Sequence, residues 1–341
     1  MDYTYSTDRL QWRAIAEKPL LAFDPTGDFA AQKKAIRERL LTQLGDRPVA
    51  VPPEVTVEYT HDEGDYIEHR LSFWAEEDAR AVCLLCIPKL GKKKYPLAIC
   101  LQGHSTGMHI SMNRDIYRQD KAEDLDRDIA RQALAHGFAA LCVEQRGMGE
   151  RRTSMVWSED DDGAPRCHST AMISLLLGRT IIGERCFDIS RALDIALTYP
   201  EIDPDRILCT GNSGGGTATY YAACLDERIK VAMPCCSVCT FKDSIAAIRH
   251  CECNYVPGLA KYMDMGDMAA CIAPRKLIVI HGDEDPIFPD AGVREAYATI
   301  QKVYEAAGVP ENCALVTGHG DHRYFAEGAW STFDRLADWA E

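Results

Sequence analysis

An apolar run that leads directly into a glycine-rich turn constrains this chain more than any other stretch. Residues 206–210 read Arg-Ile-Leu-Cys-Thr, residues 211–215 read Gly-Asn-Ser-Gly-Gly, and residues 217–225 read as a helix. Strand, tight turn and helix in this order form a nucleophile elbow, in which the serine hydroxyl projects from the sheet edge. Small neighbours at Gly211 and Gly215 let the helix pack close to the strand. The stretch therefore predicts Ser213 as a nucleophile.

A phosphate-binding loop is the main alternative for such a turn, and an ordinary serine in a glycine-rich turn is the plainest one. The turn lacks the Lys-Ser/Thr ending of a P-loop and the spacing of a dinucleotide fingerprint. The elbow interpretation then requires an acid and a base elsewhere in the chain.

The distribution of apolar residues predicts the fold class. Stretches of period two at 55–60, 66–74 and 81–88 predict successive antiparallel strands. Shorter, nearly continuous apolar runs follow, as expected for strands buried on both faces of a parallel sheet; they lie at 96–101, 138–143, 207–210, 231–233, 277–280 and 314–316. Helical segments separate several of these runs. We therefore expect an α/β fold with a doubly wound, mostly parallel sheet, in one domain at 51–341.

Two segments stand outside this pattern. Residues 1–50 predict a helical arm, with Phe29, Ile36, Leu40 and Leu44 at helical spacing, packed on the domain or on a partner subunit of a homo-oligomer. Residues 151–179 are acidic at 159–162 and predict an excursion over the carboxyl edge of the sheet, either a surface loop or a pocket wall. We expect no long apolar lid helix there.

Composition excludes several classes of partner. The formal net charge is −14 and no basic stripe is present, which argues against a nucleic acid partner. No apolar stretch approaches membrane-spanning length, so we expect no membrane partner. The first five residues are neither basic nor apolar, which predicts no signal peptide and a cytoplasmic location.

The fifteen cysteines require a separate interpretation. Many lie inside apolar runs, where cysteine behaves as a small hydrophobe, and the odd total favours reduced thiols. The best metal candidate joins Cys235, Cys236 and Cys239 to Cys251 and Cys253, but the spacing between the two clusters matches no zinc pattern. We therefore expect no metal and no cofactor.

Candidate acids and bases follow later strands. Ligands bind beyond the carboxyl ends of parallel strands, and the run at 277–280 is followed by Asp283 and Asp285. Asp285 is favoured because Pro286 fixes the turn after it, with Asp283 as the alternative. The run at 314–316 is followed by His319 and His322, either of which could serve as general base. Serine, acid and histidine then occur in the order that the elbow fold uses.

Two backbone amides complete the predicted chemistry. In a fold with this elbow, one oxyanion donor is the amide after the nucleophile, which is that of Gly214. The other comes from the loop after the third core strand, where the sequence reads Leu-Gln-Gly-His-Ser-Thr-Gly at 101–107. The amide of His104 is the expected donor because of its position after Gly103.

With these residues the chain resembles α/β-hydrolases of the dienelactone-hydrolase and acetyl-xylan-esterase-like group, from residue 55 onwards. The similar motifs are His-Gly-Asp-Glu-Asp-Pro at 281–286, His-Arg-Tyr-Phe at 322–325 followed by Ala-Trp at 329–330, Gln-Arg-Gly-Met-Gly-Glu at 145–150, Cys-Asn-Tyr-Val-Pro-Gly at 253–258, and 183–194. The resemblance favours Asp285 and His322. It implies metal-independent removal of acyl groups, often acetyl, from carbohydrates or small esters.

Two departures from this group narrow the expectation. The expected nucleophile is Ser213 and not the cysteine of dienelactone hydrolase, and the expected absence of a leader differs from secreted polysaccharide esterases. We expect a serine carboxylesterase acting on a carbohydrate or small-molecule ester. The alternatives are a serine peptidase of the prolyl-oligopeptidase type and a non-catalytic α/β-hydrolase scaffold used for binding.

Overall fold

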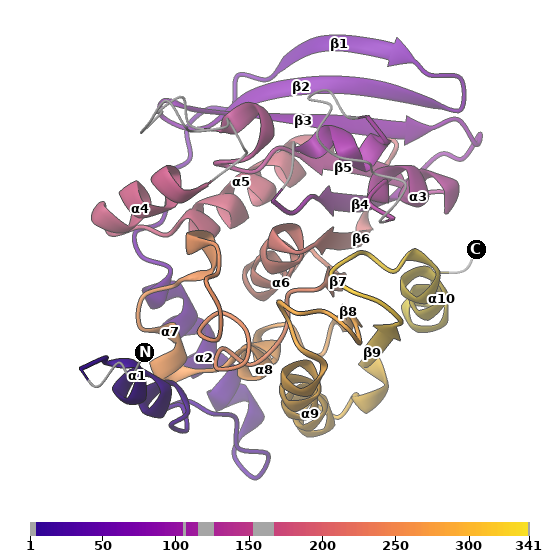
Figure 1. Ribbon diagram of the computed structural model, residues 1–341. Coiled ribbons are helices and arrows are strands. Elements are labelled where there is room, and N and C mark those ends of the chain that lie inside the picture. Colours follow the sequence, from indigo (N-terminus) through magenta and orange to yellow (C-terminus); the bar gives the residue numbers. More distant parts are fainter. Residues whose placement is uncertain (1–4, 105–106, 115–125, 153–166, 340–341) are drawn as a thin grey trace.

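One continuous sheet of nine strands runs through the computed structural model, which describes residues 5–104, 107–114, 126–152 and 167–339 (Figure 1). The strand order is β1-β2-β3-β5-β4-β6-β7-β8-β9. The strands are β1 (Thr56–Asp62), β2 (Tyr66–Glu76), β3 (Ala79–Pro88), β4 (Tyr95–Leu101), β5 (Ala139–Val143), β6 (Ile202–Asn212), β7 (Val231–Cys235), β8 (Lys276–Gly282) and β9 (Cys313–Gly318).

The pairing of these strands confirms the predicted fold class. β1, β2, β3 and β5 pair antiparallel in that order, and every pair from β5 through β4 to β9 is parallel. Every residue of β5 and of β7 is buried, as expected for apolar strands covered on both faces. β1 is mostly exposed because its polar sequence suits the edge of the sheet.

Helices cover both faces of the sheet. Figure 1 shows α3 and α10 together on one side and α5 and α6 on the other. Trp330 connects α10 to α3. Its ring stacks on His136 with 4.1 Å between ring centroids, and its Nε1 donates to Gln132 at 3.2 Å. The helices are α1 (Asp8–Ile15), α2 (Phe29–Gln43), α3 (Ile129–Ala135), α4 (His168–Leu176), α5 (Ile181–Ala196), α6 (Gly214–Leu225), α7 (Leu259–Tyr262), α8 (Met265–Met268), α9 (Asp290–Ala306) and α10 (Ala326–Ala337).

The N-terminal region lies against the α7–α8 segment. Ile36 and Leu40 of α2 are buried in the main core, and the helix begins where the Asp28 carboxylate accepts the amide of Ala31 at 2.7 Å. The backbone amides of Leu20 and Leu21 donate to carbonyls of residues 261 and 262 at 3.0 and 2.7 Å. By contrast, α1 has no buried residue.

The predicted excursion at 151–179 is described only at its ends, because 153–166 lie outside the described residues. Its later part forms α4, and the neighbouring side chains Leu176 and Leu177 are 86% and 65% exposed. The acidic run at 159–162 did not indicate these apolar side chains. The local sequence Met-Ile-Ser-Leu-Leu-Leu at 172–177 supplies these apolar side chains. None of the described helices combines the length and apolar character that crossing a membrane requires.

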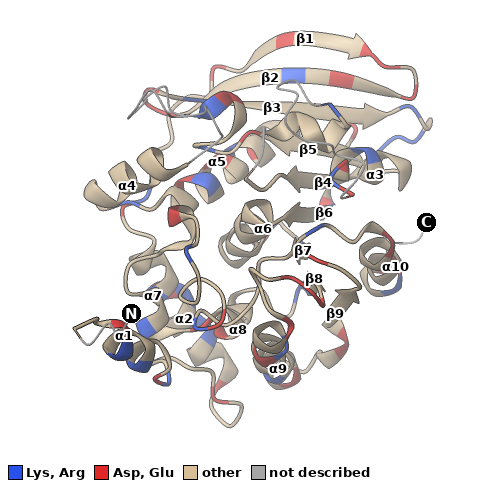
Figure 2. Cartoon of the chain, in the orientation of Figure 1, with Lys and Arg blue, Asp and Glu red and all other residues tan. Residues whose placement is uncertain are grey.

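Acidic and basic residues are interspersed along the helices and loops (Figure 2). Where the loop after β5 meets α5, several of them form a buried network. Arg146 contacts Asp188 at 2.7 Å and Glu76 at 2.6 Å, and Arg151 contacts Asp188 at 2.6 Å. Burial alone would raise the pKa of Asp188, but the guanidinium groups of Arg151 and Arg146 lower it. The network fixes this loop beside the carboxyl edge of the sheet.

Candidate active site

Ser213 occupies a strained turn between β6 and α6. Its φ of 55° and ψ of −122° lie in a region that residues with a side chain rarely adopt. The strain is held by hydrogen bonds on both sides: the Ser213 amide donates to the carbonyl of Cys235 at 2.9 Å, and its carbonyl accepts the amide of Thr217 at 2.8 Å. A side chain at Gly215 would overlap the carbonyl of Leu101. This is the local geometry that the predicted elbow requires.

The end of β4 lies directly against this turn. A Cβ placed on Gly103 would lie 2.9 Å from Ser213 Cβ and 3.4 Å from the amide nitrogen of Gly214. The next residue, His104, packs its ring on Gly214, where a Cβ would lie 3.0 Å from His104 Cε1. The structure thus brings together Ser213, Gly214 and His104. Residues 105 and 106 lie outside the described residues.

Asp285 and His322 form a buried pair on the loops after β8 and β9. His322 Nδ1 lies 2.8 Å from Asp285 Oδ2, and their side chains are 20% and 0% exposed. The other carboxylate oxygen, Oδ1, accepts the backbone amides of Ile287 at 2.8 Å and Phe288 at 3.1 Å. All of these contacts hold the carboxylate in one orientation against the imidazole.

The electrostatics of this pair favour its charged form. Burial alone would raise the pKa of Asp285, but the hydrogen bond with His322 and the two amides lower it. Burial alone would lower the pKa of His322, yet the hydrogen bond to Asp285 and the neighbouring Cys236 raise it to about 9. An imidazolium at this position is therefore stabilised, as a proton-accepting base requires.

The alternative acid and base contact each other instead. Asp283 Oδ2 lies 3.2 Å from His319 Nδ1, and its Oδ1 accepts the amide of Gly320 at 2.9 Å. Their side chains are 39% and 84% exposed. The four candidates thus form two separate pairs, one buried and one exposed.

Contacts across the sheet edge join the histidine loop to the elbow. Tyr324 is fully buried and its hydroxyl lies 2.9 Å from Thr210 Oγ1 on β6. The thiol of Cys236 donates to the carbonyl of Arg323 at 3.2 Å, while the carbonyl of Cys235 receives the Ser213 amide. The β7 end therefore lies between the elbow and the histidine loop and contacts both.

Three further side chains that the sequence did not assign to this site surround the pair. Cys236 Sγ lies within 4.8 Å of a carboxylate oxygen of Asp285 and of a ring nitrogen of His322. Phe288 stacks on His322 with 6.0 Å between ring centroids, and the ring of His250 meets Phe288 edge-on at 5.4 Å. No strand end marks His250 in the sequence, because it lies in the long irregular segment after β7. Of the three, only Cys236 carried a sequence signal, because it comes shortly after a predicted strand.

Potential metal donors gather differently from the sequence expectation. Cys235, Cys236 and Cys239 do not join Cys251 and Cys253: the first two thiols contact the carbonyl of Arg323, and Cys239 contacts that of Pro289. Cys251 and Cys253 instead meet Cys167 and His104, which lie far away in the sequence. The five cysteines of the sequence candidate therefore lie in two separate places.

The chain is similar to known proteins both in sequence and in fold. Residues 12–339 match the Abhydrolase family. A Bacillus subtilis (strain 168) protein named "Putative hydrolase YtaP" is 26% identical over 295 residues, which cover 84% of this chain and 92% of that protein. The structure of a "putative acetyl xylan esterase" from Bacteroides fragilis superposes with a TM-score of 0.75 at 18% identity, over 93% of this chain and 82% of that one. A glucuronoyl esterase from Solibacter usitatus gives a TM-score of 0.71 at 15% identity, over 94% and 97% of the chains.

The two solved structures are similar in fold, and the family match spans nearly the whole chain, from the N-terminal region to α10. The mostly parallel sheet and the strained serine turn after β6 agree with this match. The chain therefore belongs to the Abhydrolase family of α/β-hydrolases.

Proposed function

We propose that this protein is a serine carboxylic-ester hydrolase. The observation that carries the proposal is the buried His322–Asp285 pair, hydrogen-bonded at 2.8 Å, at the same sheet edge as the strained Ser213 turn. A nucleophile on a strained turn with a histidine oriented by a buried carboxylate is the arrangement used for acyl transfer. The exposed His319–Asp283 pair lacks the burial that this role requires.

In the proposed reaction His322 accepts the Ser213 hydroxyl proton while the serine oxygen attacks the ester carbonyl carbon. Asp285 holds the Nδ1–H of the imidazolium that forms. The amides of Gly214 and His104 donate to the oxyanion, and loss of one such donor typically costs about 3 kcal/mol of barrier. His322 then protonates the leaving alcohol, and a water molecule deprotonated by the same imidazole releases the acid from the acyl-enzyme.

The buried cysteine beside this pair is a poor alternative nucleophile. Its hydrogen bond with Cys235 and its burial hold the pKa of the Cys236 thiol well above its usual value. Reactive cysteines need a depressed pKa and access to substrate. Cys236 has no exposed surface, whereas Ser213 is partly exposed.

We further propose that the acyl group is short, with acetyl preferred, and that the alcohol is a carbohydrate or another small polyol. Support comes from the names of the similar structures, which include an acetyl xylan esterase from Thermoanaerobacterium that superposes with a TM-score of 0.57 at 17% identity.

A series of aryl esters from acetyl to octanoyl, hydrolysed by the wild-type protein and by Ser213→Ala, tests the proposal. We expect acetyl to give the highest kcat/KM, a decline beyond butyryl, and release of acetate from acetylated sugars. Each methylene that finds an apolar pocket contributes about 0.8 kcal/mol, so a long-chain enzyme would show the opposite trend. An octanoyl ester hydrolysed faster than the acetyl ester would refute the short-acyl proposal. Full activity of Ser213→Ala would refute the serine mechanism, and faster cleavage of a proline amide would indicate a peptidase.

A further inference from the structure

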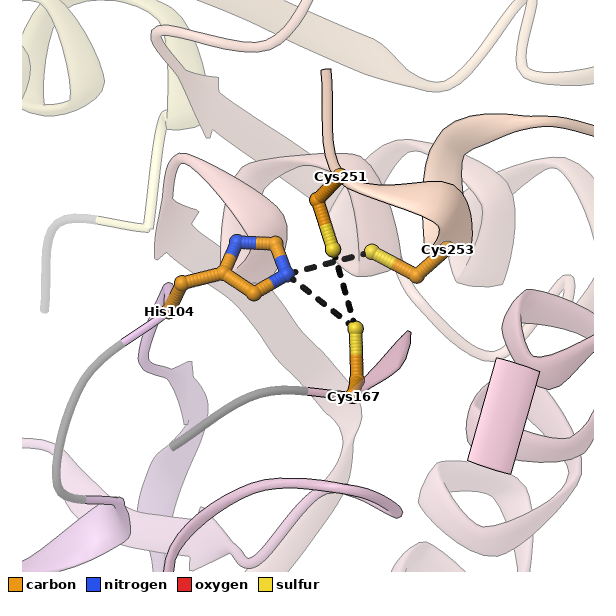
Figure 3. A group of neighbouring side chains, drawn as sticks. All are labelled: His104, Cys167, Cys251 and Cys253. Atoms are coloured by element: carbon orange, nitrogen blue, oxygen red, sulfur yellow. Dashed lines mark hydrogen bonds between the residues drawn. The ribbon is translucent and has the colours of Figure 1, made fainter. Parts of the chain in front are cut away.

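Four potential metal ligands converge beside the elbow from three distant segments (Figure 3). His104 follows β4, Cys167 precedes α4, and Cys251 comes directly before the short 3₁₀ turn η4 (Glu252–Asn254), which contains Cys253. His104 Nε2 lies 3.2 Å from Cys253 Sγ and 3.4 Å from Cys167 Sγ. Cys167 Sγ lies 3.0 Å from Cys251 Sγ, and all four donor atoms lie within 4.8 Å of one another.

This donor set fits one metal chemistry well. Three thiols and one imidazole form the Cys₃His set of structural zinc sites, and soft sulfur ligands disfavour magnesium and calcium. A tetrahedral zinc ion with ordinary bond lengths places its donor atoms roughly 3.5–3.8 Å apart, so small side-chain shifts suffice to seat the ion. With four protein ligands no coordination position is left for substrate, which indicates a structural ion.

Two of the sulfur ligands lie in an apolar cluster. Cys167 is fully buried and Cys253 nearly so, and they pack with Ala171 and Ile181 in a small apolar cluster separate from the main core. Thiols in such a place could serve for packing alone. Packing does not explain why an imidazole nitrogen and three sulfur atoms all point toward one centre, as Figure 3 shows.

A buried cation beside the sulfur atoms supplies an independent observation. Arg185 is 1% exposed; its Nε and Nη2 donate to the carbonyl of Arg146, and Nη1 has no hydrogen-bond partner among the described residues. Its guanidinium lies beside the thiols of Cys253 and Cys167. No carboxylate forms an ion pair with it within the described ranges. A buried guanidinium is costly unless an anionic group lies near it.

Zinc with three thiolates provides that anionic group. A divalent ion and three thiolates carry one negative charge in excess, which the Arg185 guanidinium neutralises. We propose that His104, Cys167, Cys251 and Cys253 bind a structural zinc ion next to the elbow. No sequence spacing connects these ligands, because they come from three separate segments.

The ion would support the proposed catalytic centre by holding a neighbouring loop in place. This consequence rests on the proposed function. The ring of His104 packs on Gly214 and Gly103 lies against Ser213, so zinc would fix the loop whose amide we assign to the oxyanion hole. Because the ligand is the His104 side chain, the backbone amide stays free to donate. Loss of the ion should lower kcat by up to about 100-fold with little change in KM.

Metal analysis of the untagged wild-type protein, purified without chelator from zinc-supplemented cells, tests the proposal without any assay of activity. We expect one zinc ion per chain by mass spectrometry. Replacement by cobalt should give the sulfur-to-cobalt charge-transfer absorption and the intense visible bands of a tetrahedral thiolate site. These two measurements need no variant and so do not depend on the folding of a mutant.

A matched pair of variants then locates the ion. Cys167→Ala should lose zinc, whereas Cys209→Ala should retain it, because Cys209 is equally buried but its thiol donates to Thr219 in the main core and is not one of the four ligands. Three results would overturn the site: metal-free wild-type protein without a tetrahedral cobalt spectrum, full zinc in Cys167→Ala, or a Cys167–Cys251 disulfide in protein prepared without reductant. Zinc bound by a protein without esterase activity would refute the proposed function and leave the metal site intact.

Discussion

Two histidine–aspartate pairs lie on the same two loops of this protein and differ chiefly in their exposure to water. In each pair His Nδ1 faces Asp Oδ2, at 2.8 Å for His322 and Asp285 and at 3.2 Å for His319 and Asp283. The side chains of the first pair are 20% and 0% exposed, and those of the second are 84% and 39% exposed. Burial, rather than residue type or spacing, distinguishes the candidates.

The physical consequence of burial is a fixed and strong interaction. Water screens the exposed pair and competes for its hydrogen bonds, so such a pair contributes little. The buried carboxylate is already oriented by the amides of Ile287 and Phe288, and its imidazole lies against Phe288. Little reorganisation is then needed when His322 accepts a proton.

The largest expected effect comes from removing each imidazole. His322→Ala should lower kcat for an aryl acetate by at least about 10⁴-fold, because the serine loses its base. His319→Ala should remain within about twofold of wild type, since an exposed side chain away from such a site has little influence. Steady-state kinetics on both variants, with circular dichroism to verify folding, make the comparison. The opposite ranking would move the base to His319.

The carboxylates should rank in the same way with a slightly smaller effect. Asp285→Asn keeps the size of the side chain but removes the charge that orients His322, so kcat should fall by on the order of 10³- to 10⁴-fold. Asp283→Asn should reduce it only slightly. Both variants replace a carboxylate by an amide of the same size, so each serves as a control for the other. Equal losses would show that both loops contribute to one site.

The pH dependence gives a test of the electrostatics. His322 must be neutral to act as base and its pKa is raised to about 9, so kcat/KM should increase with pH up to that value. Asp285→Asn removes the charge that stabilises the imidazolium, and the rise should then move to lower pH. Asp283→Asn should leave it unchanged. A rise at the same pH in all three proteins would show that His322 does not control it.

The same shift predicts a change in stability. Because the pKa of His322 is raised above its ordinary value of 6.5, the pair stabilises the folded state fully below pH 6.5, and this contribution is lost as the pH rises through about 9. Denaturant unfolding of wild type and Asp285→Asn across this range measures it. The wild-type free energy of unfolding should fall more steeply than that of the variant.

Much of the fold was predictable because the local signals agree with one another. Apolar runs marked every strand of the parallel half, whereas the exposure of β1 at the edge of the sheet was not predicted. Element bounds were less accurate: β6 begins at Ile202, five residues before the expected run, because its polar first half continues the strand at the surface. The exposed apolar surface of α4 was missed because the acidic run before it dominated the interpretation.

Site residues were predictable only where a reactive side chain comes directly after a strand. Ser213, Asp285 and His322 each follow a strand, so topology alone brings them to one edge. The choice between Asp285 and Asp283 rested on one proline, and burial separates these carboxylates only in three dimensions. The convergence of Cys167 with His104 depends on the path of α4 and η4 across the edge, for which the sequence carries no periodic signal.

The smallest expected effect is the response of the two pairs to salt. The hydrogen bond with Asp283 and its charge raise the pKa of His319, but both side chains are open to solvent. The Debye length falls from about 10 Å at 0.1 M to about 3 Å at 1 M salt, so screening should return the pKa of His319 toward its ordinary value. The pKa of His322 should hardly move, because no mobile ion can come between a buried carboxylate and the imidazole that it contacts. Imidazole NMR titrations at low and high salt measure both residues in one sample. Equal shifts would mean that water reaches the two pairs alike, and the distinction by burial on which the choice of His322 rests would be lost.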